Sequence, residues 1–513
     1  MLPPVKPEAL VRKLVAVLGL ALLAAAAPAQ QPAAERLLRE AARLAESGSG
    51  EAALQELTLL VQQFPDDAVA PAAWLRIAEL RRARGERDAA ASALARLLGD
   101  HGRSAQAAEG LLLQGRMAVD DAQGLAALAA ARNAFRRVPL LFGRELYPGL
   151  EARRAARVES GEVALLLDDP AAAAAEFLAA LEDEPEAARD SAQGEALTGR
   201  ARLGLARAWL AAGQWTAAAA VLEEAAARQG AADEAGRARA RRLASLLERR
   251  VLRPMSGQRA WLTTGRFPPA GLELREPAGV AAASDGRLLV VDEKLPLVAL
   301  LDARGRGTAR QALGGVARPG WLASGHPFAV GAGGVVLPFD ATSYAFVEPQ
   351  RSAPLKNLLA AQPGIFGDWF VVAKGWRGVI HSPAAGASRE LLAEARPDVV
   401  DLARGELGRV YALAARAGQV VRLGREGVGH AVVLTGDWRR PVALDVDELG
   451  YVYVLDRGER AVDLFAPGGR RLARVGPDLG AGIELRQPVD VAVDGAGRLF
   501  IADAKLPYVL VLE

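Results

Sequence analysis

Few residues of this 513-residue chain have the types and spacing that catalysis or metal binding requires. The four histidines, His101, His326, His381 and His430, are isolated from one another along the sequence. The chain contains no nucleophile elbow, phosphate-binding loop, His-Glu-x-x-His pair or dinucleotide fingerprint. A solitary histidine is more often a surface or hydrogen-bonded residue than a ligand or a base. We therefore predict no catalytic residue.

Carboxylates and cysteines add little to a catalytic interpretation. Asp445 and Asp490 alone suggest carboxylates that point into an interior site, and two such residues give little support for a bound cation. The absence of cysteine excludes disulfides, thiol nucleophiles, Cys-ligated zinc and iron–sulfur clusters. We predict no metal and no cofactor.

The N-terminus has the features of an export signal. Lys6, Arg12 and Lys13 precede an apolar run from Leu14 to Ala27, followed by a small-residue cleavage site. This run is shorter than the roughly 20 residues that span a bilayer. We expect residues 1–29 to be a signal peptide and the mature protein to be exported to a Gram-negative-type periplasm or secreted, without an integral membrane span. Nucleic acid is then not an expected partner.

The first half of the chain predicts paired helices. Residues 33–251 are rich in Ala, Leu, Arg and Glu, with apolar residues every three to four positions. In residues 73–98 and again in 205–227, a helix with a Trp is followed by a turn glycine, Gly85 or Gly213, and a second helix. Such repetition predicts a helical hairpin solenoid.

These spacings resemble the tetratricopeptide repeat, and "FPDDAVAPAAW" from Phe64 is similar to envelope proteins of that class. The resemblance implies a concave groove that binds a peptide or a helix of another envelope protein. A spacer or dimerisation role for the array is the alternative.

After a linker at 252–258 the sequence changes to short apolar runs separated by Asp-Gly, Gly-Gly and Pro, which predict strands and turns. Units beginning at Pro277, Pro319, Pro397, Pro441 and Pro488, with a further copy at 365–383, recur about every 42 residues. Six units of this length predict a six-bladed β-propeller over 259–513. The last unit has only three strands, so we expect residues 260–265 to supply its fourth.

The phrase Pro-x-x-Val…Asp-Gly-Arg-Leu-x-Val-x-Asp resembles the NHL repeat. Some similar propellers are lyases with axial His ligands, and others bind a central cation. The Asn and Arg that the family usually carries after the second strand are replaced here by "DEKLP" and "DAKLP".

One face of such a propeller collects basic residues. The loops that lead into the inner strands and the loops that join the second and third strands share one surface, which we call the basic loop face. Three of the four propeller lysines fall in equivalent loops there, beside two tryptophans. We expect this face to bind an anionic ligand through Lys294, Arg318, Lys374, Trp376, Arg377, Arg396, Trp438, Arg440, Arg457 and Lys505. Ordinary solvated loop charge is the alternative.

The sequence therefore predicts a non-enzymatic scaffold, with a helical groove for envelope proteins and a basic loop face for an acidic protein or an anionic glycan or cell-wall polymer. The competing hypotheses are a propeller lyase or hydrolase with an axial active site, and a purely structural spacer.

Overall fold

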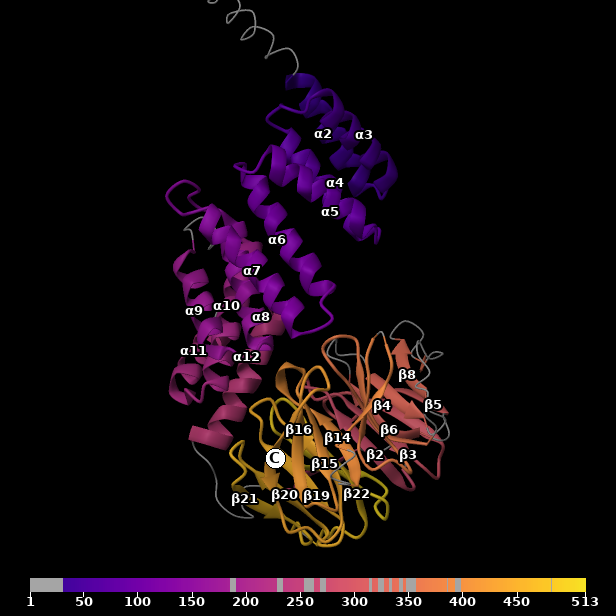
Figure 1. The fold of residues 1–513 in the computed structure, drawn as a ribbon. Helices are drawn as coiled ribbons and strands as arrows, with labels where there is room; N and C mark the ends of the chain where they lie inside the picture. The colour runs from indigo at the N-terminus through magenta and orange to yellow at the C-terminus, as the bar shows by residue number, and fades with distance from the viewer. Residues whose placement is uncertain are drawn as a thin grey trace, which may run out of the picture. The chain divides into compact units, whose positions relative to one another are not determined.

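A computed structural model shows a helical array followed by a β-propeller (Figure 1). The structure describes residues 31–184, 191–227, 234–252, 263–267, 274–312, 316–321, 327–331, 335–340, 345–346, 357–384, 386–392, 398–480 and 482–513. The expected signal peptide at 1–29 lies outside these residues. None of the helices within the described ranges is both long and apolar enough to cross a membrane.

The helices alternate with short turns, as the repeat pattern predicts. Gly85 and Gly213 stand in two of these turns at φ +77° and +72°, a conformation that glycine adopts without strain. The helices are α2 (Gln31–Glu46), α3 (Gly50–Gln63), α4 (Ala70–Ala83), α5 (Arg87–Asp100), α6 (Ala105–Asp120), α7 (Leu125–Leu141), α8 (Glu151–Leu166), α9 (Pro170–Glu182), α10 (Ala192–Ala211), α11 (Trp215–Ala227) and α12 (Glu234–Leu247), and a π-helical turn follows at Glu248–Leu252.

Within the described ranges, the second half forms six four-stranded antiparallel sheets. Their strands are β2 (Pro277–Ala282), β3 (Leu288–Asp292), β4 (Leu297–Leu301) and β5 (Gly307–Ala312); β6 (Val316–Trp321), β7 (Pro327–Gly331), β8 (Val335–Asp340) and β9 (Ala345–Phe346); β10 (Leu358–Pro363), β11 (Trp369–Ala373), β12 (Val379–Ser382) and β13 (Arg389–Leu391); β14 (Val399–Arg404), β15 (Val410–Ala414), β16 (Gln419–Leu423) and β17 (His430–Thr435); β18 (Pro441–Val446), β19 (Val452–Asp456), β20 (Ala461–Phe465) and β21 (Arg471–Val475); and β22 (Pro488–Val493), β23 (Leu499–Asp503) and β24 (Val509–Leu512) with β1 (Thr263–Phe267).

The sheets close into a ring through their inner strands. The inner strands β2, β6, β10, β14, β18 and β22 each contact the next, and β22 contacts β2. In the last sheet β1 is the outer strand and pairs antiparallel with β24, Phe267 opposite Val509. Because β1 precedes the first sheet in sequence and completes the last one, the chain itself joins the two ends of the ring. Of the strand expected at 260–265, residues 260–262 lie outside the described ranges.

The chain divides into two compact units, and their boundary is not the helix-to-strand transition at 252–258. One unit comprises 1–121 and 130–160, and the other comprises 122–129 and 161–513. The second unit joins helices to the propeller because they share a core: Leu243, Leu246 and Leu247 of α12 pack with Tyr451, Tyr453 and Leu499 of the last two sheets. The first unit has a core of its own, formed by residues of α2 to α6.

Polar contacts reinforce the shared core of the second unit. Arg239 of α12 lies 3.0 Å from both Glu406 and Glu448, and Arg207 of α10 also pairs with Glu406. Although burial opposes ionisation of Glu406, Arg207 and Arg239 hold its pKa below the usual value. These glutamates lie in the turns between first and second strands. Helices α10 and α12 therefore contact the ends of the strands that lie opposite to the basic loop face.

Candidate functional site: the propeller axis and the basic loop face

The inner strands place a set of polar side chains around the axis. Each inner strand has a register shift near its start, and the residues after the shift are, in sheet order, Gly279, Arg318, Ala360, Asp401, Ala443 and Asp490. Two positions later stand Ala281, Gly320, Gln362, Ala403, Asp445 and Ala492. In the first of these layers charged residues alternate with glycine or alanine, so the long side chains have room to meet at the centre.

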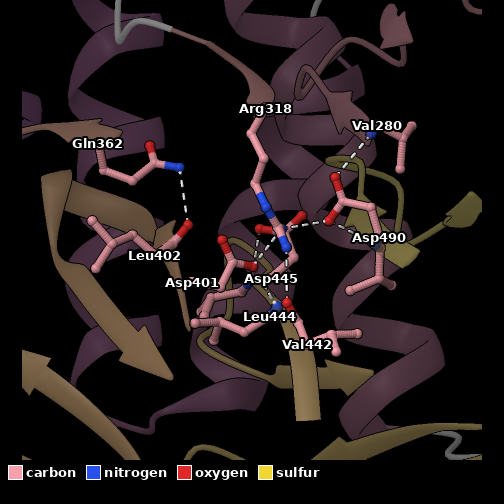
Figure 2. Close-up of polar contacts among 11 residues, drawn as sticks. Val280, Arg318, Gln362, Asp401, Leu402, Val442, Leu444, Asp445 and Asp490 are labelled. Atoms are coloured by element: carbon pink, nitrogen blue, oxygen red, sulfur yellow. Dashed lines mark hydrogen bonds and ion pairs between the residues drawn. The ribbon is translucent and has the colours of Figure 1, made fainter. Parts of the chain in front are cut away.

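Arg318 is at the centre of this cluster, and Figure 2 shows its guanidinium between two aspartates. Its Nη1 lies 2.7 Å from Asp401 Oδ2 and 2.7 Å from Asp490 Oδ1. Its Nη2 donates a 2.8 Å hydrogen bond to the carbonyl of Val442. One cation thus joins its own strand β6 to three other inner strands, β14, β18 and β22, and satisfies two buried carboxylates.

The carboxylates also connect each of their sheets to the next. Asp401 accepts a hydrogen bond from Leu444 N at 2.8 Å, and Asp490 accepts one from Val280 N at 2.9 Å (Figure 2). Asp445 accepts a hydrogen bond from Val493 N at 2.7 Å. Inner strands are edge strands, so their N–H groups need partners from outside the sheet. The Asp490 contact links the last sheet to the first.

Burial changes the protonation of these groups. The pKa of Asp445 is raised to about 8, mainly by desolvation and also by the nearby charges of Asp490 and Asp401, against its two backbone hydrogen bonds. Desolvation also raises the pKa of Asp401 to about 7, although Arg318 opposes the shift. At neutral pH the axis therefore holds at least one protonated carboxyl beside the guanidinium of Arg318, which two aspartates share.

The cluster lines a polar cavity of about 100 Å³, which is enough for a few water molecules. Within the described ranges, no group of three or more His, Cys, Asp or Glu side chains could hold a metal ion. The polar atoms at the axis already bond neighbouring strands. Chemically, the arrangement can store a proton and hold the ring together.

The loops of the basic loop face are fixed by aspartates at the ends of the second strands. Asp292 accepts hydrogen bonds from the backbone N–H groups of Arg275 and Glu276, before the inner strand, and of Lys294 in the following loop. Asp456 and Asp503 make the same set of contacts in the last two sheets. These residues fix turns, as their strand-terminal position indicates, and both loops of each sheet lie on one surface.

Several predicted site residues are exposed on this surface. Lys294, Lys374, Arg377, Arg440 and Lys505 are exposed. Trp376 is 44% exposed. Arg457 is half-buried. Lys294 and Lys505 occupy equivalent loops of two neighbouring sheets, because β2 contacts both β22 and β23.

Three predicted residues are placed differently or not described. Arg396 lies outside the described residues. Trp438 is partly buried, and its indole N–H donates a 3.1 Å hydrogen bond to Asp463, so this ring is held within its own sheet. Arg318 does not belong to the loop face. Strand β6 begins at Val316, so Arg318 falls inside the strand and its side chain reaches the axis.

Sequence reasoning does not find Asp401 or the axial position of Arg318. This error arises because the repeat units are taken to begin at Pro319 and Pro397. The inner strands β6 and β14 begin at Val316 and Val399 instead. Aligning the units on the second strands rather than on proline would have placed Arg318, Asp401 and Asp490 at one equivalent position.

Comparisons with known proteins identify no family. No protein-family model matches the chain, and no curated protein matches it. A streptogramin B lyase structure aligns with 48% of this chain and 96% of its own, at 13% identity and a TM-score of 0.37. Virginiamycin B lyase from Staphylococcus aureus aligns with 47% of this chain and 97% of its own, at 12% identity and a TM-score of 0.36. A calcium-binding regucalcin from Agrobacterium tumefaciens aligns with 50% of this chain and 95% of its own, at 15% identity and a TM-score of 0.39.

Proposed function

We propose that this protein is a non-enzymatic envelope adaptor. Its propeller binds an anionic partner on the basic loop face, and its helical array binds other envelope proteins. The observation that carries the proposal is the set of aspartate clamps, Asp292, Asp456 and Asp503, which hold two cation-bearing loops per sheet on one surface. Fixed loops lose little conformational entropy when a ligand binds.

The location of the helices supports this assignment. Helices α10 and α12 contact the turns between first and second strands, through Arg207, Arg239 and their glutamate partners. The second unit therefore leaves its basic loops at the opposite ends of the strands. Export, suggested by residues 1–29, would bring this face to the acidic polymers and proteins of an envelope.

The exposed side chains define the ligand's chemistry. Lysine ammonium groups at Lys294, Lys374 and Lys505 are compact charges suited to carboxylates, and the exposed face of Trp376 can stack on a sugar ring. The ligand would therefore carry carboxylates and a surface that stacks on a tryptophan. Such ligands include a carboxylated glycan, an acidic protein or a cell-wall fragment.

The test is a charge reversal at the two equivalent lysines, Lys294→Glu/Lys505→Glu. Its matched control reverses two exposed arginines of outer strands, Arg310→Glu/Arg471→Glu, which changes net charge equally. Binding to alginate and to poly-L-glutamate is measured by calorimetry at low salt, because exposed charges are screened at high salt. We expect the lysine variant to bind at least tenfold more weakly and the control to keep most of its affinity. Equal losses in both variants would disprove a specific face.

The axis supports a second candidate, a lyase or hydrolase. The observation in its favour is the raised pKa of Asp445 and Asp401 beside a polar cavity, which is a pattern found at catalytic acids and bases. Hydrolysis of a panel of chromogenic glycosides and esters tests it. Turnover that is abolished by Asp445→Asn and retained in Arg310→Gln would support this candidate.

A further inference from the structure

A second basic site lies in the same unit, away from the basic loop face. Its cavity has a volume of about 320 Å³ and lies between the α8–α9 turn and the fourth sheet. The turn contributes Leu166 and Asp168. The sheet contributes Arg409, Arg422 and Arg425, together with the glycine-rich turn between β16 and β17.

Positive charge is in excess in this cavity. Three guanidinium groups line it, and only two carboxylates do, from Asp168 and Glu426. The Glu426 carboxylate accepts a 2.6 Å hydrogen bond from the backbone N–H of Leu125. One oxygen of Asp168 pairs with both Arg409, at 2.6 Å, and Arg425, at 3.1 Å. A single carboxylate oxygen is therefore shared by two arginines.

Two residues that line the cavity each have a buried donor without a partner in the described part of the chain. The Nε atoms of Arg409 and Arg425 are buried and have no hydrogen-bond acceptor among the described residues. The Arg425 side chain is only 6% exposed, and its position is fixed because Nη1 donates to the carbonyl of Leu166. A buried guanidinium donor without an acceptor is unfavourable. Both residues also line the cavity, so an anion bound there would lie beside their guanidinium groups.

We propose that this cavity binds the oxyanion group of a small molecule, a phosphate or a carboxylate. Arg409 and Arg425 are held in place by Asp168, and Arg425 also by the carbonyl of Leu166. Arg422 is exposed and offers a third guanidinium at the opening. Planar guanidinium groups match both kinds of oxyanion with paired hydrogen bonds. The bound anion would connect the α8–α9 turn to the propeller, so the ligand would stabilise the second unit as a whole.

Two variants test the site in opposite directions. Asp168→Asn removes the competing carboxylate, and asparagine accepts the positive φ of +58° at this position, so the turn is retained. It should bind anions about tenfold more tightly. Arg422→Gln removes the exposed cation and should bind about tenfold more weakly, as expected for one charge-assisted hydrogen bond. Arg310→Gln, on the exposed outer strand β5, is the control and should bind as the wild type does.

The measurement is calorimetric titration of the full chain with sodium phosphate and, separately, with sodium malonate, each at an ionic strength matched with sodium chloride. Binding of phosphate alone or malonate alone identifies the oxyanion class. The proposal is overturned if neither anion binds more tightly than chloride. It is also overturned if an anion binds but Asp168→Asn and Arg422→Gln leave the affinity unchanged. Neither result bears on Lys294 or Lys505, so the proposed function is tested independently.

Discussion

Asp445 is a half-buried carboxyl at the propeller axis whose surroundings favour its protonated form. Its carboxyl accepts hydrogen bonds from Val446 N and Val493 N. The charges nearby are those of Asp401 and Asp490, which are themselves paired with Arg318. Burial raises its pKa to about 8, far above the value of about 3.9 in an unfolded chain. The folded protein therefore binds a proton that the unfolded chain releases above about pH 4.

The sign of the resulting pH effect follows from linkage. Between about pH 4 and pH 8 the folded state binds more protons, so this group's contribution to the free energy of unfolding falls as pH rises, by up to about 1.4 kcal/mol per unit. Asp445→Asn cannot ionise, so we expect its stability relative to wild type to increase between pH 6 and pH 8.5. Urea unfolding at several pH values measures this difference. A difference that does not change with pH would mean that Asp445 is ionised in the folded protein.

The same cluster shows which single residues could be placed from the sequence and which could not. The sequence suggests Asp445 and Asp490 as carboxylates that point inward. Arg318 was assigned to a loop, since proline was used as the mark of each strand start. Proline begins β18 and β22 but stands inside β6. Register within a divergent sheet depends on pairing with the next strand, and one sequence does not contain that information directly.

At the scale of elements, close packing of helices depends on particular glycines. Phe177 of α9 is fully buried between α8 and α10, where Gly161 and Gly204 face its ring. A Cβ atom at Gly204 would lie 2.4 Å from the ring, and one at Gly161 would lie 2.8 Å from it. The sequence indicated helix pairs and their turns correctly, because apolar periodicity and glycine turns are local signals. The contact between Phe177 and two glycines from other helices is not local and was not predicted.

This packing predicts opposite effects for two similar substitutions. Gly204→Ala should destabilise the protein by about 1–3 kcal/mol, because the methyl group overpacks against Phe177. Gly99→Ala, in α5 with no atom within 4 Å of the added methyl, should stabilise its helix by about 0.5–1 kcal/mol. Thermal unfolding of both variants provides the comparison. If Gly204→Ala is as stable as the wild type, the close approach of these helices is wrong.

At the scale of the whole molecule, the boundary between compact units differs from the boundary between helices and strands. The sequence marks the change of secondary structure at 252–258, since periodicity and turn residues change there. It does not show that α12 shares a core with the last two sheets, because that core joins residues more than 200 positions apart. Leu246, for example, packs against the turn at Gly497.

The shared core predicts which parts of the chain unfold together. Leu246→Ala should cost about 2–5 kcal/mol, as for other buried leucines, and should increase hydrogen exchange in strands β19 and β23 as well as in α12. Leu57→Ala, a fully buried residue in the core of the first unit, is the matched control and should increase exchange in α3 and α4 but not in those strands. An effect of Leu246→Ala confined to α12 would contradict a common unit.

We propose that the axis holds the propeller together and that the basic loop face binds the partner. One measurement compares both places directly: the affinity of wild type, Asp445→Asn and Lys294→Glu/Lys505→Glu for alginate at low salt. We expect the axial variant to bind alginate as the wild type does and the lysine variant to bind it at least tenfold more weakly. Loss of binding in Asp445→Asn, with full binding in the lysine variant, would contradict this proposal.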